Sequence, residues 1–297
     1  QGKWNPILCA LMLNRAALNV QWSPSGTKFA VGSGAKTIAV SRLDRSQGSD
    51  WYVSKLIKGH KSSVVQVAWH PNELVIATAC TDFKCRVVSA VVEEVDTSPN
   101  PTPFGSVKPF GEAYHIFSCG GWVTAVAWSP SGSILAYAGQ DSTIHLVRFD
   151  QGGAFTEQTV RYAMLPVSAL VFLSERAVVG GGHDMNPLVF SADSSGNWSF
   201  LQQLDEKSTV AAKSAVAASS MASARAMFQA KTTRGQASSG GAGKDLWTQH
   251  ANTIVGMEGM GRAGDAACSK LSTCGLDGRI VVWEIPTLDI DMRALGL

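Results

Sequence analysis

Val123–Asp150 reads VTAVAWSPSGSILAYAGQDSTIHLVRFD and contains the pattern from which we infer the fold. Its first six residues are apolar on both alternating faces, a pattern typical of a strand that lies between two layers. Pro130 and Gly132 predict one tight turn, and Asp141 predicts a second because an Asp side chain can bond its own backbone. We therefore expect three strands, over 123–128, 134–138 and 143–149. A small sheet with two buried faces needs neighbours of its own kind.

Copies of this stretch recur along the chain. Trp followed by Ser-Pro or His-Pro stands at Trp22, Trp69 and Trp128, a degenerate fourth copy has Phe172 in its first strand, and a fifth copy ends at Ile285. The first three anchors are 47 residues (69 − 22) and 59 residues (128 − 69) apart. A WD repeat spans about 40–45 residues and forms one four-stranded propeller blade. The Pro-rich run near residue 100 accounts for the longer interval as an inserted rim loop.

The repeat predicts an all-β fold, a WD-repeat β-propeller that occupies 1–297 as a single domain. About five blades are visible, and the segment 1–14 is interpreted as the last strand of an earlier blade. The segment 206–248 breaks the pattern between the last two blades and is expected to be a flexible, partly helical insert.

An Asp occupies the second turn of four copies, at Asp82, Asp141, Asp184 and Asp277. We interpret these four, together with His60, Trp22, Trp69, Trp128 and Trp283, as structural residues of the repeat, because they recur at equivalent positions. Of these turns, only that of Asp82 has a matching histidine in the expected place, His60, so the full His–Asp pair is expected there alone. A carboxylate set for glycoside hydrolysis is the alternative, but the repeated turn position favours a structural role.

Composition and motifs exclude several functional classes. Hydrophobic residues make up 45% and charged residues 16% of the chain. The net charge of +2 argues neither for nor against nucleic acid, and no nucleic-acid partner is expected. No apolar run is long enough for a membrane span. The six cysteines lack zinc-type spacing and favour buried free thiols in a reducing compartment. No catalytic motif is found, so neither enzymatic activity nor a cofactor or metal is expected.

The insert carries a candidate binding helix. Ala217, Met221, Ala224 and Phe228 fall at helical spacing and form one apolar face. The surrounding segment is basic, and no acidic residue lies between Lys207 and Lys244. An apolar stripe with nothing to pack on predicts a partner groove, with contacts from Met221, Arg225, Phe228 and Lys231. The alternative is a disordered loop that contains a nascent helix.

At Asp82–Ala90, DFKCRVVSA, the sequence resembles the WD-repeat subunit (subunit 1) of the actin-related protein 2/3 complex. Further matching runs follow the same order along the chain. They are KFAVGSG at 28–34, WHPN at 69–72, PTPFG at 101–105, PFGE at 109–112, GWV at 121–123, DST at 141–143, GHD at 182–184 and ARAMFQ at 224–229. Generic WD repeats lack these runs, so the resemblance is specific.

The resemblance implies a non-catalytic scaffold and regulatory subunit that supports the nucleation of branched actin filaments in the cytoplasm and actin cytoskeleton. It implies as partners the other subunits of the complex, the actin filament, and acidic activators of the Wiskott–Aldrich type. Lys84 and Arg86 are the candidate activator contacts, with solvated rim charges as the alternative. The family propeller has seven blades, so we expect this chain to be a fragment that forms an open ring.

Two rival functions remain open at this point. A WD-repeat adaptor in another multiprotein assembly would share the repeat, but it would not require the Asp82–Ala90 run. A propeller hydrolase would require converging carboxylates beyond the repeated turn Asp.

Overall fold

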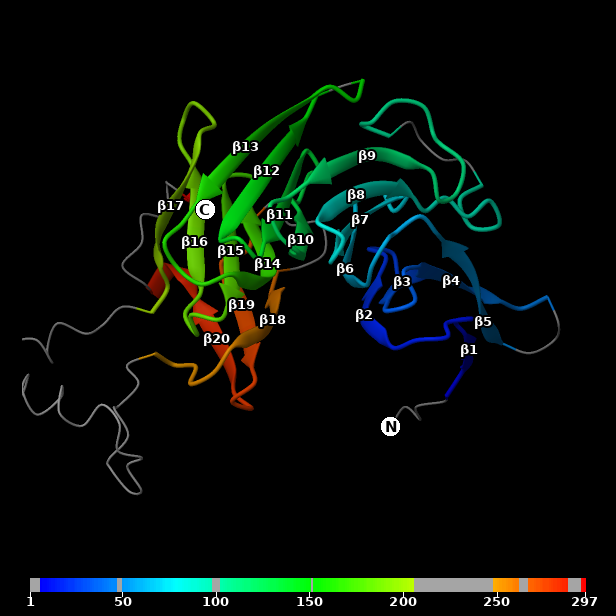
Figure 1. Ribbon diagram of the computed structural model, residues 1–297, viewed down its shortest axis with the longest axis horizontal. Coiled ribbons are helices and arrows are strands. Elements are labelled where there is room, and N and C mark those ends of the chain that lie inside the picture. Colours follow the sequence, from blue (N-terminus) through cyan, green and yellow to red (C-terminus); the bar gives the residue numbers. More distant parts are fainter. Residues whose placement is uncertain are drawn as a thin grey trace, which may run out of the picture.

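The computed structural model describes residues 6–46, 50–97, 102–150, 152–205, 248–261, 267–287 and 295–297. Their strands form five sheets that follow one another along an arc, and each sheet turns one of its edge strands toward the inner side of the arc (Figure 1). Each inner strand packs beside the next, in the order β2 (Ala17–Trp22), β6 (Val64–Trp69), β10 (Val123–Trp128), β14 (Val167–Ser174) and β18 (Ile254–Gly259). The predicted all-β propeller fold of five blades is confirmed.

The first three blades each contain four antiparallel strands in sequence order from the inside outward. Blade 1 consists of β2 (Ala17–Trp22), β3 (Lys28–Ser33), β4 (Ile38–Asp44) and β5 (Trp51–Ile57). Blade 2 consists of β6 (Val64–Trp69), β7 (Val75–Cys80), β8 (Lys84–Ser89) and β9 (Ala113–Ser118). Blade 3 consists of β10 (Val123–Trp128), β11 (Ile134–Gly139), β12 (Thr143–Phe149) and β13 (Phe155–Arg161). The two inner turns of blade 3 lie where the sequence predicts them.

The last two blades differ in their number of described strands. Blade 4 consists of β14 (Val167–Ser174), β15 (Ala177–Gly182), β16 (Leu188–Ala192) and β17 (Trp198–Gln203). Blade 5 consists of β18 (Ile254–Gly259), β19 (Lys270–Gly275) and β20 (Ile280–Glu284), followed by the short 3₁₀ helix η1 (Ile285–Thr287). Among the described strands β20 pairs only with β19, so it forms the outer edge of this sheet.

The interpretation of the N-terminal segment as part of an earlier blade is wrong. Strand β1 (Leu8–Ala10) pairs in parallel with β5, with Leu8 opposite Trp51, and thereby becomes a fifth strand of blade 1. The physical reason is that the outer edge of β5 offers unpaired backbone groups, which a short extended segment can satisfy. Periodicity alone cannot choose between sheets, since it specifies a strand and not its partner.

Hydrophobic clusters fill the junctions between neighbouring blades. The cluster between blades 2 and 3 includes Val87, Val126 and Tyr137, all buried, and Phe104 from the Pro-rich loop joins it. Phe104 packs against His70, Trp128 and Phe149, with ring centroids 4.7–5.9 Å apart. The Pro-rich segment is therefore more than a rim loop, because its aromatic residue helps to join two blades.

Each Ser-Pro-Ser-Gly turn is held by a glutamate of the next blade. The Ser25 N–H and hydroxyl donate to the Glu73 carboxylate over 2.5 and 2.6 Å. In the same way the Ser131 N–H donates to Glu175 over 2.6 Å. The turn is thus closed locally by its Pro and Gly, while its position relative to the next blade depends on a carboxylate that is distant in sequence.

Candidate functional site

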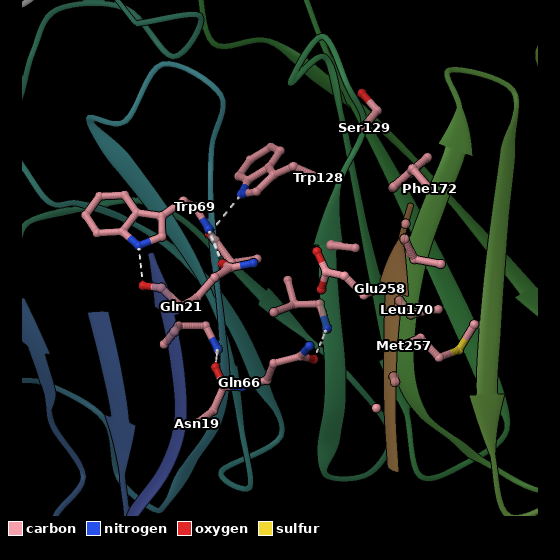
Figure 2. Close-up of a pocket in the computed structure, with 18 of the residues that line it drawn as sticks. Asn19, Gln21, Gln66, Trp69, Trp128, Ser129, Leu170, Phe172, Met257 and Glu258 are labelled. Atoms are coloured by element: carbon pink, nitrogen blue, oxygen red, sulfur yellow. Dashed lines mark hydrogen bonds between the residues drawn. The ribbon is translucent and has the colours of Figure 1, made fainter. Parts of the chain in front are cut away.

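The inner strands of all five blades line a cavity of about 850 Å³ (Figure 2). A cavity of this size is ordinarily the first place to look for a ligand site. Its polar lining includes Asn19, Gln21, Gln66, Thr124 and Ser168. Whether the cavity can do chemistry depends on whether these side chains are free.

They are not free, because each bonds the backbone of the following blade. The side-chain oxygens of Asn19, Gln21 and Gln66 accept hydrogen bonds of 2.8–3.1 Å from the N–H groups of Val67, Trp69 and Val126. The hydroxyls of Thr124 and Ser168 donate over 2.7 and 2.6 Å to the carbonyls of Val167 and Ile254. Figure 2 shows the three hydrogen bonds of the Asn and Gln side chains, which connect one blade to the next along the cavity wall. The polar lining therefore joins blades together.

The repeated tryptophans are part of the same joints. The Trp69 indole N–H donates to the Gln21 carbonyl over 3.0 Å, and the Trp128 indole N–H donates to the Ala68 carbonyl over 3.2 Å. Both side chains are buried, whereas Trp22 at the end of the arc is 51% exposed. The tryptophans predicted as structural residues thus differ in environment according to whether a described blade precedes them.

The described residues that line the cavity form no arrangement that supports catalysis. Desolvation raises the pKa of Glu258, which lines the wall, but no hydrogen bond joins its carboxylate to another described residue. Within the described part of the chain, no three His, Cys, Asp or Glu side chains are placed to hold a metal ion. None of the described helices is long and apolar enough to cross a membrane.

The complete turn network lies in blade 5. Asp277 accepts from the Ala251 N–H over 2.6 Å and from His250 Nδ1 over 3.3 Å. His250 Nε2 bonds the Thr273 hydroxyl over 2.7 Å, and that hydroxyl also accepts from the Trp283 indole N–H over 2.9 Å. The Ala251 amide, with help from His250, lowers the pKa of Asp277 to about 2. Sequence reasoning missed His250 because the insert separates it from the recognisable part of its repeat.

The expected pair between His60 and Asp82 is not formed. His60 Nε2 bonds the Thr78 hydroxyl over 3.2 Å, while its buried Nδ1 has no hydrogen-bond partner among the described residues. Asp82 instead accepts two bonds from the Arg86 guanidinium, over 3.0 and 2.7 Å, and one from the Lys61 N–H. The reason is that Arg86, on the third strand, reaches the turn carboxylate with a planar fork that a histidine cannot match.

The pKa values of His60 and Asp82 reflect this exchange of partners. Burial, and then the charge of Arg86, lowers the pKa of His60 to about 4, so its imidazole is neutral at pH 7. Burial opposes ionisation of Asp82, but the hydrogen bonds from Arg86 and Lys61 outweigh it and hold the pKa of Asp82 far below its usual range. Arg86, predicted as an activator contact, is therefore engaged inside its own blade.

The turn aspartates of blades 3 and 4 are also engaged. Asp141 accepts from the Thr143 hydroxyl over 2.6 Å and lies 3.7 Å from the Cys119 sulfur. Asp184 accepts from the Leu165 N–H over 2.6 Å, while burial raises its pKa. The four aspartates thus hold four separate turns and do not converge on one point.

All four turns lie at the same end of the blades, which we term the aspartate-turn end. Here Phe83 and Trp122 are 47% and 48% exposed, and Lys84 donates to the Ser118 hydroxyl over 3.2 Å. The Phe83 carbonyl accepts from the Cys119 N–H over 2.9 Å, which places the Phe83 turn beside the loop that leads to Trp122. We term Phe83, Lys84 and Trp122 the aromatic–lysine corner.

The charge at the aspartate-turn end favours acidic ligands. Lys36, Lys58 and Lys61 are exposed in its turns and loops, between β3 and β4 and between β5 and β6. The turn carboxylates at this end already accept hydrogen bonds. Asp141 accepts from its own turn, and the other three accept from backbone N–H groups in the loops that lead to the inner strands of their blades. The free charges that remain near the corner are therefore largely positive. The insert residues Met221, Arg225, Phe228 and Lys231 lie outside the described residues.

Known proteins are similar to this chain along most of its length. The family model "WD domain, G-beta repeat" matches residues 51–89 and 111–147. Actin-related protein 2/3 complex subunit 1B of Arabidopsis thaliana is 40% identical over 98% of this chain and 76% of the relative. Subunit 1A-B of Xenopus laevis is 36% identical over 100% and 77%, and subunit 1 of Schizosaccharomyces pombe is 34% identical over 96% and 77%.

Proposed function

Because this chain belongs to the family of actin-related protein 2/3 complex subunit 1, we propose that it is a non-catalytic scaffold and regulatory subunit of such a complex, where it supports nucleation of branched actin filaments. The observation that carries the proposal is identity of 34–40% to plant, frog and yeast subunits along nearly the whole chain. The other subunits of the complex are its partners, and the cytoplasm and actin cytoskeleton are its location.

A scaffold role agrees with the physical character of the molecule. The polar groups of the cavity are used between blades, and the four turn carboxylates hold separate turns. What the blades offer to other proteins is a rigid frame with exposed loops and strand edges. A rigid frame can bind several partners at once without itself changing shape.

We place the contact with acidic activators at the aromatic–lysine corner. Lys84 supplies charge there, while Phe83 and Trp122 supply exposed aromatic area suited to a hydrophobic anchor. Arg86 supports the corner indirectly, because its pair with Asp82 fixes the turn that carries Phe83. We expect Lys84→Glu to weaken binding of an acidic activator peptide severalfold in fluorescence anisotropy. The matched control is Lys36→Glu in blade 1, and an equal loss in both variants would contradict a specific corner.

We assign the insert to contact with the actin filament. The apolar face that the sequence predicts here contains Met221 and Phe228, and the basic residues Arg225 and Lys231 are close to them in sequence. Such a combination suits an acidic partner that has a hydrophobic cleft. Phe228→Ala is expected to slow branched assembly of pyrene-labelled actin while the purified complex keeps all its subunits. Phe155→Ala, at an exposed Phe of strand β13, is the control. Unchanged branching kinetics in Phe228→Ala would eliminate the insert from filament contact.

Co-purification tests the proposed function as a whole. Affinity capture of the tagged full-length protein from its own cells is expected to recover two actin-related proteins and several small subunits. Recovery of the protein with an unrelated set of partners would instead favour the alternative, a WD-repeat adaptor of another assembly. Recovery of the protein alone would contradict both.

A further inference from the structure

A second, smaller cavity of about 140 Å³ lies at the outer rim, where blade 3 meets blade 4. Arg148, Thr156 and Ile134 form one row across β12, β13 and β11, and Leu146 lies in the next row. The opposite wall is formed by Ser195, in the turn between β16 and β17, and by Trp198, the first residue of β17. None of these residues belongs to the inner cavity or to the aspartate-turn end.

The walls of this cavity are held in place by the Gln158 side chain. Its amide nitrogen donates to the Gly196 carbonyl over 3.0 Å, and its oxygen accepts from the Trp198 N–H over 2.9 Å. The turn is closed further by Asp193, which accepts from the Ser195 and Asn197 N–H groups over 2.8 and 2.9 Å. The two blades are therefore clamped at this point, and the cavity between them is preformed.

The polar groups left over in the cavity are mainly donors. The Arg148 side chain forms no ion pair or hydrogen bond with another described residue. The hydroxyl groups of Thr156 and Ser195 also form no hydrogen bond with a described residue. No carboxylate lines the cavity, and the remaining wall is apolar, with Leu146 and the Trp198 ring. A free guanidinium beside two hydroxyls matches an anion with two oxygens in one plane.

The volume limits the size of the ligand. A water molecule occupies about 30 Å³ of liquid, so the cavity holds the equivalent of a few waters. That is enough for a carboxylate and the methylenes behind it. Pockets for cofactors and metabolites usually enclose about 300–1,000 Å³, so a nucleotide does not fit.

We propose that this cavity binds the carboxylate of an acidic side chain on a partner polypeptide that runs along the rim between β13 and β17. The carboxylate pairs with Arg148 and the two hydroxyls, while its methylenes pack against Trp198. The site is independent of the family assignment, since its ligand chemistry follows from the free donors and the cavity size alone.

The test follows the Trp198 indole signal of the full 297-residue chain by NMR with ¹⁵N-labelled tryptophan. The chain has nine tryptophans, so the spectrum contains nine indole N–H signals. The signal that is missing in Trp198→Phe is that of Trp198. The probe is N-acetyl-glutamate α-amide, and the matched neutral control is N-acetyl-glutamine α-amide. We expect a saturable shift with the acid at millimolar concentration and none with the amide.

Arg148→Gln is expected to weaken acid binding at least tenfold, whereas Arg161→Gln, at the far end of β13, leaves it unchanged. Unshifted signals of the other tryptophans in Arg148→Gln verify that the fold is retained. The proposal is overturned by an equal shift with the neutral amide, by undiminished binding in Arg148→Gln, or by the absence of a shift. A shift with inorganic phosphate but not with the acid probe would also overturn it, because the ligand would then be a phosphate group.

Discussion

At the scale of single residues, the repeated tryptophans differ in what their indole nitrogens contact. Trp128 donates to the Ala68 carbonyl of the preceding blade, whereas Trp22 is half exposed at the end of the arc. Replacement by Phe keeps an aromatic ring and removes the donor. We expect Trp128→Phe to lower the free energy of unfolding by about 1–2 kcal/mol, because the buried carbonyl loses its partner.

Trp22→Phe is the matched control for that substitution. Its indole packs edge-on against Phe29 and Tyr52, with ring centroids 4.9 and 6.0 Å away, and a Phe preserves much of this contact. We expect a change below about 0.5 kcal/mol in urea denaturation. Equal losses for Trp22 and Trp128 would show that the indole hydrogen bond contributes nothing to the blade joint.

His60 makes folding sensitive to acid. Burial followed by the charge of Arg86 lowers its pKa to about 4 in the folded chain, so the unfolded chain takes up the proton first as the pH falls. The contribution of neutral His60 to the free energy of unfolding is therefore complete above about pH 6.5, and it is lost as the pH falls toward 4. We expect His60→Gln to reduce the loss of unfolding free energy between pH 7 and pH 4.5 by on the order of 1–3 kcal/mol.

The measurement is urea denaturation of both chains across this pH range. His183→Gln, in the exposed turn between β15 and β16, is the control. A variant His60→Gln whose stability follows the same pH curve as the parent chain would assign the acid sensitivity to other groups.

At the scale of elements, the β7–β8 turn is held by a buried ion pair. The Asp82 and Arg86 side chains are only 5% and 7% exposed and bond through two N–H···O contacts. Asp82→Asn leaves the Arg86 charge buried without a counter-charge, and breaking such a pair costs about 3–5 kcal/mol. We expect thermal or urea denaturation to report a loss of this size.

A double variant separates the effect of the buried charge on stability from the effect of the turn hydrogen bonds. In Asp82→Asn with Arg86→Met no buried charge remains, so the loss is expected to be smaller than in Asp82→Asn alone. Asp193→Asn, in an exposed turn without an ion pair, controls for the loss of turn hydrogen bonds. A double variant that is less stable than Asp82→Asn would mean that Arg86 contributes mainly through packing.

At the scale of the whole molecule, the two ends of the arc expose apolar surface. Val20 on β2 is 61% exposed, and Ile280 on the edge strand β20 is 77% exposed. Exposed apolar faces and free strand edges promote association. We expect the 297-residue chain to self-associate with rising concentration, measured by sedimentation velocity.

Val20→Lys combined with Ile280→Lys is expected to lower this association without lowering the melting temperature, because neither side chain is buried. Ile116→Lys, on the outer strand β9 of blade 2, changes an exposed residue away from the arc ends and serves as the control. A parent chain that stays monomeric and melts cooperatively at high concentration would contradict this view of the arc.

Most of the strands, the inner turns and the five visible blades could be predicted from local sequence patterns. Alternating apolar residues specify a strand, and turn residues such as Pro130 and Gly132 specify a turn. Both effects extend over only a few neighbouring positions, so they can be recognised in the sequence alone. Predicted and observed strands therefore agree at Val123–Trp128 and Thr143–Phe149. The family resemblance arose from runs such as Asp82–Ala90 that the repeat does not require.

Which side chains contact one another depends on the tertiary structure. The tertiary structure pairs Asp82 with Arg86 in place of His60. It brings His250 and Asp277 together in the complete turn network of blade 5, and it pairs β1 with β5. It also opened the rim cavity at Arg148. These contacts join residues from different strands or blades, where distance, direction and competition among donors decide the partner. A periodic pattern contains none of that information, because it describes each strand without its neighbours.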